Sequence, residues 1–157
     1  STLDRSSAAS DVYKRQLVEI IRKLKRPYVR YTRADEKNVR KADCLIIDCF
    51  GLLSSIYRYG EIAYIGGGFG VGIHNTLEAA VYGIPVIFGP KYQKFQEAIQ
   101  LLEAKGAFSV KDYEELKTLL DRMLTDEVFL RESGMNASNY VTGNAGATDK
   151  IMSMINF

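Results

Sequence analysis

Three stretches of this sequence combine residue types that could bind a phosphorylated ligand, and each follows a short apolar run. The first is Asp48-Cys49-Phe50-Gly51, the second runs from Gly66 to Glu78, and the third is Gly89-Pro90. In open parallel sheets, ligands bind beside the carboxyl ends of the strands. If the three apolar runs are strands of such a sheet, the three stretches converge on one site.

The second stretch opens with five glycines among the seven residues from Gly66 to Gly72. Glycine lacks a Cβ atom, so the backbone can adopt a positive φ and approach a ligand closely. Exposed amides ahead of a helix favour a phosphate, which predicts that the Gly66–Gly72 amides, together with Asn75, hold one. Neither common phosphate-binding glycine motif fits the loop, and a purely structural tight turn would also explain the glycines.

The glycine loop is followed by His74-Asn75-Thr76-Leu77-Glu78. We expect Asn75 or Thr76 to cap the next helix and Glu78 to lie in its first turn. The Glu78 carboxylate would gain there from the helix dipole, or it would point into the cleft and accept both hydroxyls of a ribose. His74 is the only histidine of the chain, and it is either a structural hydrogen-bonding group or a ligand contact.

The elements that must position these residues alternate between strands and helices. Short apolar runs predict strands at residues 28–31, 44–47, 62–65, 85–88 and 107–110. Helical spacing of apolar residues predicts helices at residues 17–24, 52–59, 76–82, 95–105, 112–124, 127–140 and 147–155. In the 112–124 helix, Asp112 and Glu115 resemble a capping box, and the buried face is predicted to comprise Tyr113, Leu116, Leu120 and Met123. The alternation predicts an α/β domain with a parallel sheet and helices on both faces.

Composition limits the class of protein. The chain has 157 residues, enough for one domain with a sizeable core. A net charge of +2 does not indicate nucleic-acid binding. The short basic run at residues 22–26 is typical of a solvated helix face, with phosphate or membrane-surface contact as the alternative.

Cys44 and Cys49 are too few for a disulfide framework and lack metal-ligand spacing. We therefore expect no metal, and no cofactor is expected either. No apolar stretch approaches the roughly 18 residues of a membrane span, and no secretory signal is visible, so a cytoplasmic location is expected.

Residues 1–16 are expected to lie outside the fold. The first ten are small and mostly polar, and residues 11–16 resemble a translated transposon adaptor. We expect a non-native or unpacked leader at 1–16 and a ligand-binding domain at 17–157. An ordinary helical lead-in is the alternative.

In combination, these motifs resemble the family of Kdo (3-deoxy-D-manno-octulosonic acid) transferases. The resemblance covers residues 26–124 and is carried by Asp48 and Gly51, Gly66-Gly67, His74-Asn75-x-Leu77-Glu78, Gly83-x-Pro85-Val86, and Gly89-Pro90 with Phe95 in register. It implies the Rossmann-like, carboxy-terminal half of a two-domain GT-B fold. The donor-binding residues would be Asp48, Gly51, Gly66, Gly67, Gly68, His74, Asn75, Glu78, Gly89 and Pro90. Ile73, Thr76 and Lys94 depart from the Gly, Pro and Asn that are usual in the family.

The resemblance also implies a reaction. CMP-Kdo would be the donor, a lipid A precursor the acceptor, and the transfer would be inverting, at the cytoplasmic face of the membrane, in lipopolysaccharide inner-core synthesis. The catalytic base is expected in an amino-terminal domain outside this chain, so we expect the chain alone to be inactive and only the full-length protein to associate peripherally with the membrane.

Two other functions remain open. One is a UDP-sugar-using GT-B transferase or a sugar-nucleotide epimerase domain. The other, from a different class, is a non-catalytic, flavodoxin-like binding module.

Overall fold

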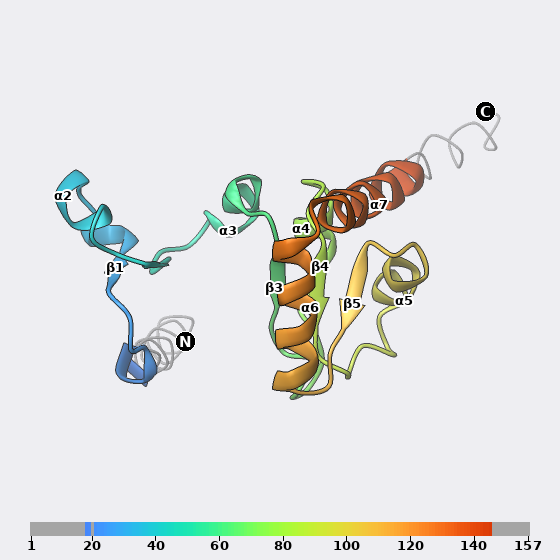
Figure 1. Cartoon of the computed structure of the whole chain (residues 1–157), viewed down its shortest axis with the longest axis horizontal. Helices are drawn as coiled ribbons and strands as arrows, with labels where there is room; N and C mark the ends of the chain where they lie inside the picture. Colours follow the sequence, from blue (N-terminus) through green and yellow to red (C-terminus); the bar gives the residue numbers. More distant parts are fainter. Residues whose placement is uncertain (1–17, 20, 146–157) are drawn as a thin grey trace, which may run out of the picture. The chain divides into compact units, whose positions relative to one another are not determined.

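The computed structural model describes residues 18–19 and 21–145 (Figure 1). The predicted leader at 1–16 and the helix predicted at 147–155 lie outside these residues. Residues 18–19 and 21–23 are helical, within the helix predicted at 17–24. The described part of the chain divides into two compact units, with the boundary between Leu53 and Ser54.

The first unit contains a two-stranded parallel sheet. Strand β1 (Tyr28–Arg30) pairs with β2 (Cys44–Ile46), and both strands lie inside the predicted apolar runs. Between them lie the 3-10 turn η1 (Tyr31–Arg33) and the short helix α2 (Glu36–Val39), neither of which was predicted.

The second unit contains a three-stranded parallel sheet in the order β3-β4-β5. Its strands are β3 (Ala63–Ile65), β4 (Val86–Phe88) and β5 (Ala107–Ser109). The helical segments are α3 (Leu53–Ile56) at the boundary of the units, η2 (Tyr57–Tyr59), α4 (Leu77–Ala80), α5 (Gln96–Glu103), α6 (Tyr113–Thr125) and α7 (Glu127–Ala145). The predicted alternation of parallel strands and helices is confirmed.

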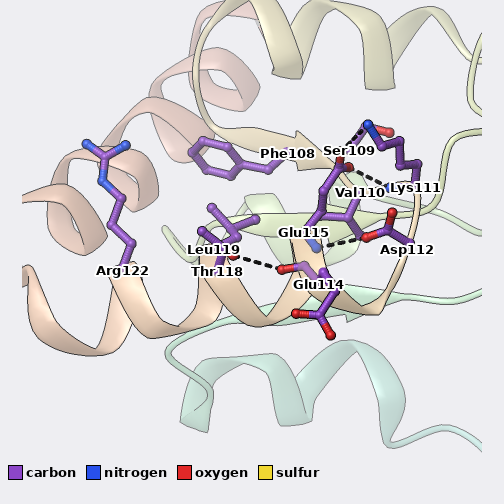
Figure 2. Close-up of a pocket in the computed structure, with 10 residues that line it drawn as sticks. All are labelled: Phe108, Ser109, Val110, Lys111, Asp112, Glu114, Glu115, Thr118, Leu119 and Arg122. Atoms are coloured by element: carbon purple, nitrogen blue, oxygen red, sulfur yellow. Dashed lines mark hydrogen bonds and ion pairs between the residues drawn. The ribbon is translucent and has the colours of Figure 1, made fainter.

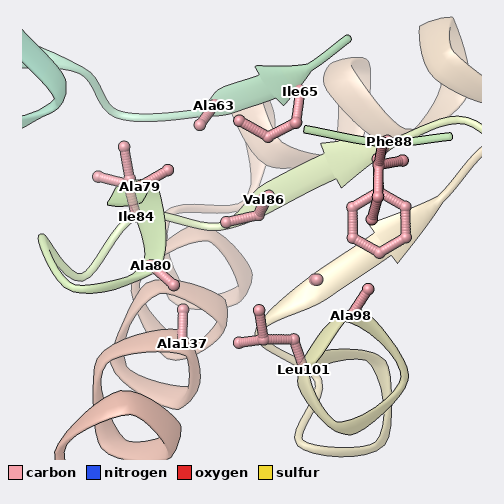
Figure 3. Close-up of a cluster of buried hydrophobic side chains, with 12 residues drawn as sticks. Ala63, Ile65, Ala79, Ala80, Ile84, Val86, Phe88, Ala98, Leu101 and Ala137 are labelled. Atoms are coloured by element: carbon pink, nitrogen blue, oxygen red, sulfur yellow. The ribbon is translucent and has the colours of Figure 1, made fainter. Parts of the chain in front are cut away.

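Helices cover both faces of this second sheet. Side chains of a strand alternate between its faces, so Val86 and Phe88 pack towards α4, α5 and α7, whereas Ile87 packs towards α6. All three are fully buried, with 0% of their surface exposed. Figure 3 shows the first of these clusters, in which the small side chains of Ala80 and Ala137 let α4 and α7 approach closely. The predicted arrangement of helices on both faces is therefore correct.

Close backbone contacts hold α7 against this face. A Cβ atom on Gly134 of α7 would overlap the carbonyl oxygen of Gly83, which follows α4. A Cβ atom on Gly106 would lie 2.6 Å from the backbone nitrogen of Ala137. Because side chains at Gly134 and Gly106 would collide, glycine at both positions is what allows α7 to pack on its neighbours.

The start of α6 differs in detail from its prediction. Asp112 accepts a hydrogen bond from the amide of Glu115 at 2.9 Å, as expected of a helix cap. The Glu115 side chain accepts from the amide of Lys111 instead of that of Asp112, so only half of the capping box forms. Tyr113 is 69% exposed, so the buried face of α6 begins at Leu116 and the prediction for Tyr113 is wrong. None of the helices in the described ranges is long and apolar enough to cross a membrane.

Candidate functional site

The loops that follow β3 and β4 are in direct backbone contact. A Cβ atom on Gly68 would lie 2.6 Å from the nitrogen of Gly89 and 2.7 Å from its Cα atom. The carbonyl oxygen of Gly68 also accepts a hydrogen bond from the amide of Lys91 at 2.9 Å. The structure therefore brings Gly68 and Gly89 together at the carboxyl ends of two paired strands.

The glycine loop closes on the carbonyl group of Gly67. Gly67 has φ of +90°, a backbone conformation that residues with a Cβ atom rarely adopt. Its carbonyl oxygen accepts hydrogen bonds from the amides of Gly70 and Gly72 at 2.8 and 3.3 Å. These two amides, which were assigned to a phosphate from the sequence, are thus engaged inside the loop. The amides of Gly68 and Val71 donate to no acceptor in the described part of the chain; Val71 is exposed, whereas Gly68 is buried against Gly89.

His74 lies at the far end of the loop and is exposed. Its amide donates to the carbonyl oxygen of Gly66 at 3.2 Å, and its Cδ2 atom lies 3.4 Å from the position of a Cβ atom on Gly67. The imidazole therefore lies over the start of the glycine loop.

Asn75, and not Thr76, caps α4. Its Oδ1 atom accepts from the amide of Leu77 at 3.0 Å, and its Nδ2 atom donates to Oε1 of Glu78 at 3.0 Å. Glu78 is half-buried in the first turn of α4, the position predicted for it. Because Asn75 occupies one carboxylate oxygen, Oε2 of Glu78 is the acceptor that a ligand could use.

The hydroxyl group of Thr76 is buried without a partner. Thr76 is 1% exposed, and its Oγ1 atom forms no hydrogen bond with any described residue. Because an unsatisfied buried hydroxyl costs about 1–3 kcal/mol, we expect Thr76→Val to raise the free energy of unfolding by about 1 kcal/mol. Urea denaturation would measure this, with Thr76→Ser, which keeps the hydroxyl, as the variant that gains nothing. A loss of stability in Thr76→Val would contradict the conclusion that the Thr76 hydroxyl is buried without a hydrogen-bond partner among the described residues.

Tyr57 is a neighbour of Glu78 that was not predicted as a site residue. It lies in η2 and packs against the first core cluster. Burial and, second, the negative charge of Glu78 raise the pKa of its hydroxyl. Tyr57 lies within the helix predicted at residues 52–59, and the sequence carried no signal for this contact.

Asp48 lies in the first unit, and its carboxylate is fully engaged there. The side chain is 1% exposed, and its oxygens accept from Nε of Arg30 at 2.7 Å and from the amide and hydroxyl of Thr32 at 2.9 and 2.7 Å. Neither partner was predicted, although both lie at the end of the neighbouring strand. Gly51, in the same unit, has φ of +85° with nothing within 4 Å of a Cβ position, so its conformation and not its packing favours glycine.

These contacts predict an unusually acidic carboxyl group. Hydrogen bonds from Thr32 and, less strongly, the ion pair with Arg30 lower the pKa of Asp48 from 3.8 to about 2. A lowered pKa in the folded state stabilises the fold above the ordinary pKa, and that contribution is lost as the pH falls through about 2. We expect the Asp48 carboxyl resonance to titrate near this lower value by NMR, and Thr32→Val to move its midpoint upward. A wild-type midpoint at 3.8 would contradict the contacts described.

A hollow of about 550 Å³ opens at the end of β5, beside the first turns of α6 (Figure 2). It is lined by Phe108, Ser109, Val110, Lys111, Asp112, Glu114, Glu115, Thr118, Leu119 and Arg122. Most of its polar groups stabilise the first turns of α6. Lys111 forms an ion pair with Glu115 at 2.6 Å, and the hydroxyl of Thr118 donates to the carbonyl oxygen of Glu114. None of the residues predicted for the site lines this hollow.

A smaller hollow of about 250 Å³ borders the glycine loop. It is lined by Gly70, Val71, Lys91, Gln93, Lys94 and Phe95. Apart from Gly70 and Val71, which lie in the predicted glycine loop, none of these was predicted to contact a ligand, although two lysines close behind Gly89-Pro90 were a visible signal. Within the described ranges, no group of three or more His, Cys, Asp or Glu side chains could hold a metal ion.

Comparison with known proteins identifies relatives that are named 3-deoxy-D-manno-octulosonic acid transferase. No protein-family model matches the chain. The 3-deoxy-D-manno-octulosonic acid transferase of Aquifex aeolicus is 42% identical over 87 residues, which are 54% of this chain and 25% of that protein. The protein of the same name from Rickettsia bellii is 32% identical over 116 residues, 72% of this chain and 28% of that protein. The chain thus spans about a quarter of the length of these relatives.

Among solved structures, the chain resembles the C-terminal CMP-Kdo binding domain of WaaA from Acinetobacter baumannii. The TM-score is 0.70 at 18% identity, and the match covers 83% of this chain and 68% of that one. At this identity the match establishes a shared fold, which is the expected Rossmann-like arrangement. The resemblance inferred from the sequence is therefore confirmed: the chain is related to the 3-deoxy-D-manno-octulosonic acid transferases and has the fold of the carboxy-terminal domain of WaaA.

Proposed function

We propose that this chain is the donor-binding part of a Kdo transferase and binds CMP-Kdo. The observation that carries the proposal is the meeting of two strand-end loops at Gly68 and Gly89, in the unit that also holds the Asn75–Glu78 pair. The carboxyl ends of parallel strands are where open α/β sheets bind ligands. The names of the relatives and of the WaaA domain support CMP-Kdo as the donor.

In the proposed complex, Oε2 of Glu78 accepts hydrogen bonds from the ribose hydroxyls of the cytidine. The phosphate receives hydrogen bonds from the amides of Gly68 and Val71, which have no acceptor within the described residues, and from the second N–H of Asn75. Holding the donor in fixed geometry and stabilising the departing CMP are the contributions of such a site to catalysis.

The remaining predicted residues have weaker support. His74 and Pro90 flank the same two loops and are proposed to border the donor. For Asp48 and Gly51, which lie in the first unit, the family resemblance alone supports a donor contact.

For the complete enzyme we propose transfer of Kdo from CMP-Kdo to a lipid A precursor. The resemblance assigns the base to an amino-terminal domain of the full-length transferase. Because this acceptor is a membrane lipid, the full-length protein would bind peripherally to the membrane. The family resemblance implies that the reaction takes place at the cytoplasmic face of the inner membrane.

The proposal predicts that Glu78→Gln weakens CMP binding with little loss of stability. Charge-assisted hydrogen bonds to a desolvated carboxylate are worth roughly 1.5–3 kcal/mol each, so affinity should fall about tenfold or more. The loss of the helix-dipole interaction should cost only about 0.3–1 kcal/mol of stability. Calorimetric titration and urea denaturation of both proteins would measure the two effects.

Glu97 offers a matched control, since it lies in the first turn of α5 and outside the proposed site. Glu97→Gln should leave CMP affinity unchanged. Unchanged CMP affinity in Glu78→Gln would remove Glu78 from the site. Tighter binding of UMP or UDP than of CMP by the wild type would favour the UDP-sugar alternative, and binding of no nucleotide would favour a non-catalytic module.

A further inference from the structure

Two of the residues that line the hollow beside the glycine loop are lysines without a counter-charge in the described part of the chain. Lys91 and Lys94 are exposed, and neither has a carboxylate oxygen within 4.0 Å among the described residues, whose ion pairs involve other cations. None of the six residues that line the hollow is acidic. The hollow therefore has an uncompensated positive charge.

The backbone beneath the two lysines is held in place by the glycine loop and by its own contacts. The amide of Lys91 donates to the carbonyl oxygen of Gly68 at 2.9 Å, and Nε2 of Gln93 donates to that of Pro90 at 2.7 Å. A Cβ atom on Gly72 would lie 2.9 Å from Cε2 of Phe95, so the aromatic ring packs directly on the loop. Lys91 and Lys94 are thus carried on a backbone that is held beside the loop proposed for the phosphate.

We propose that this hollow binds the carboxylate of the sugar acid carried by the donor nucleotide. The inference rests on the proposed function. A CMP-linked octulosonic acid carries two anionic groups, a phosphate and a carboxylate. In the proposed complex the amides of Gly68 and Val71 bind the phosphate, and Lys91 and Lys94 supply the separate positive charge that a carboxylate needs. A volume of about 250 Å³ suits part of a sugar, and apolar Val71 and Phe95 complete its wall.

The test compares the binding of CMP and of CMP-Kdo, because only the second carries the carboxylate. Calorimetric titrations would use the wild-type chain and the double variant Lys91→Gln/Lys94→Gln, which removes both charges and keeps both stems. Lys105→Gln is the matched control, since Lys105 follows the other end of α5 and does not line the hollow.

In the double variant we expect CMP-Kdo affinity to fall on the order of fivefold, while CMP affinity stays unchanged. Lys105→Gln should alter neither affinity. The loss of CMP-Kdo affinity in the double variant should be clear at about 0.01 M salt, where the Debye length is about 30 Å. It should largely vanish near 1 M salt, where the Debye length is about 3 Å.

Three results would overturn the inference, and each points to a different explanation. Equal losses for CMP and CMP-Kdo would assign the lysines to the phosphate. Unchanged CMP-Kdo affinity with weaker binding of a phosphorylated lipid A precursor would assign them to the acceptor. Failure of the wild-type chain to bind CMP at all would reject the proposed function itself, and the carboxylate site with it.

Discussion

The Gly68→Ala variant is expected to unfold at a clearly lower urea concentration than the wild type and to lose CMP binding in its folded fraction. The added methyl group would lie 2.6–2.9 Å from the backbone N, Cα and C atoms of Gly89, where no side chain can rotate away. Forcing extra atoms into such a contact costs typically about 1–3 kcal/mol, and here we expect the upper end of that range. The displaced loop would also move the amides proposed for the phosphate.

Gly70→Ala provides the control within the same loop. The nearest atom to a Cβ on Gly70 is the carbonyl oxygen of Gly67 at 3.6 Å, which is an ordinary van der Waals distance. The free energy of unfolding of Gly70→Ala should therefore stay within about 0.5 kcal/mol of the wild-type value. Similar stabilities for the two variants would show that the loops at Gly68 and Gly89 are not in close backbone contact.

Gly134→Ala is expected to destabilise the protein, although the same change in the interior of a helix normally stabilises it. Alanine gains about 0.5–1 kcal/mol over glycine there because less backbone entropy is lost. At Gly134 the methyl group would overlap the carbonyl oxygen of Gly83, so we expect a net loss of about 2 kcal/mol. Chemical denaturation would measure the change.

Gly143 tests the same substitution in the same helix. Nothing lies within 4 Å of its Cβ position, so Gly143→Ala should gain up to about 1 kcal/mol. The two variants are therefore expected to differ in sign. A gain in both would mean that α7 does not pack on the turn after α4.

The strands were the most predictable part of the fold. Val86, Ile87 and Phe88 form an uninterrupted apolar run because helices cover both faces of β4, and that run was visible in the sequence. Helix α2 was not predicted because no apolar stripe marks it. Its signal was a capping box formed by Asp35 and Asn38, which is a local hydrogen-bond pattern and not a periodic one.

The candidate site was predictable only in part. The order of strands and loops indicated that Gly68 and Gly89 belong to one edge of a sheet, but not that their backbones touch. The engagement of Asp48 depends on Arg30 across a strand pair, which a linear pattern does not reveal. The same holds for Lys91, whose backbone amide is bonded to the carbonyl oxygen of Gly68 in the glycine loop.

The backbone contact between the loops at Gly68 and Gly89 has a consequence for the thermodynamics of binding. A mobile loop that orders on a ligand loses conformational entropy, at about 1–2 kcal/mol per residue, and this loss weakens the affinity. Because the loop at Gly68 lies against the loop at Gly89, both are already ordered by folding. The site is thus preorganised at these loops, and a ligand would be accommodated there with little further loss of chain entropy.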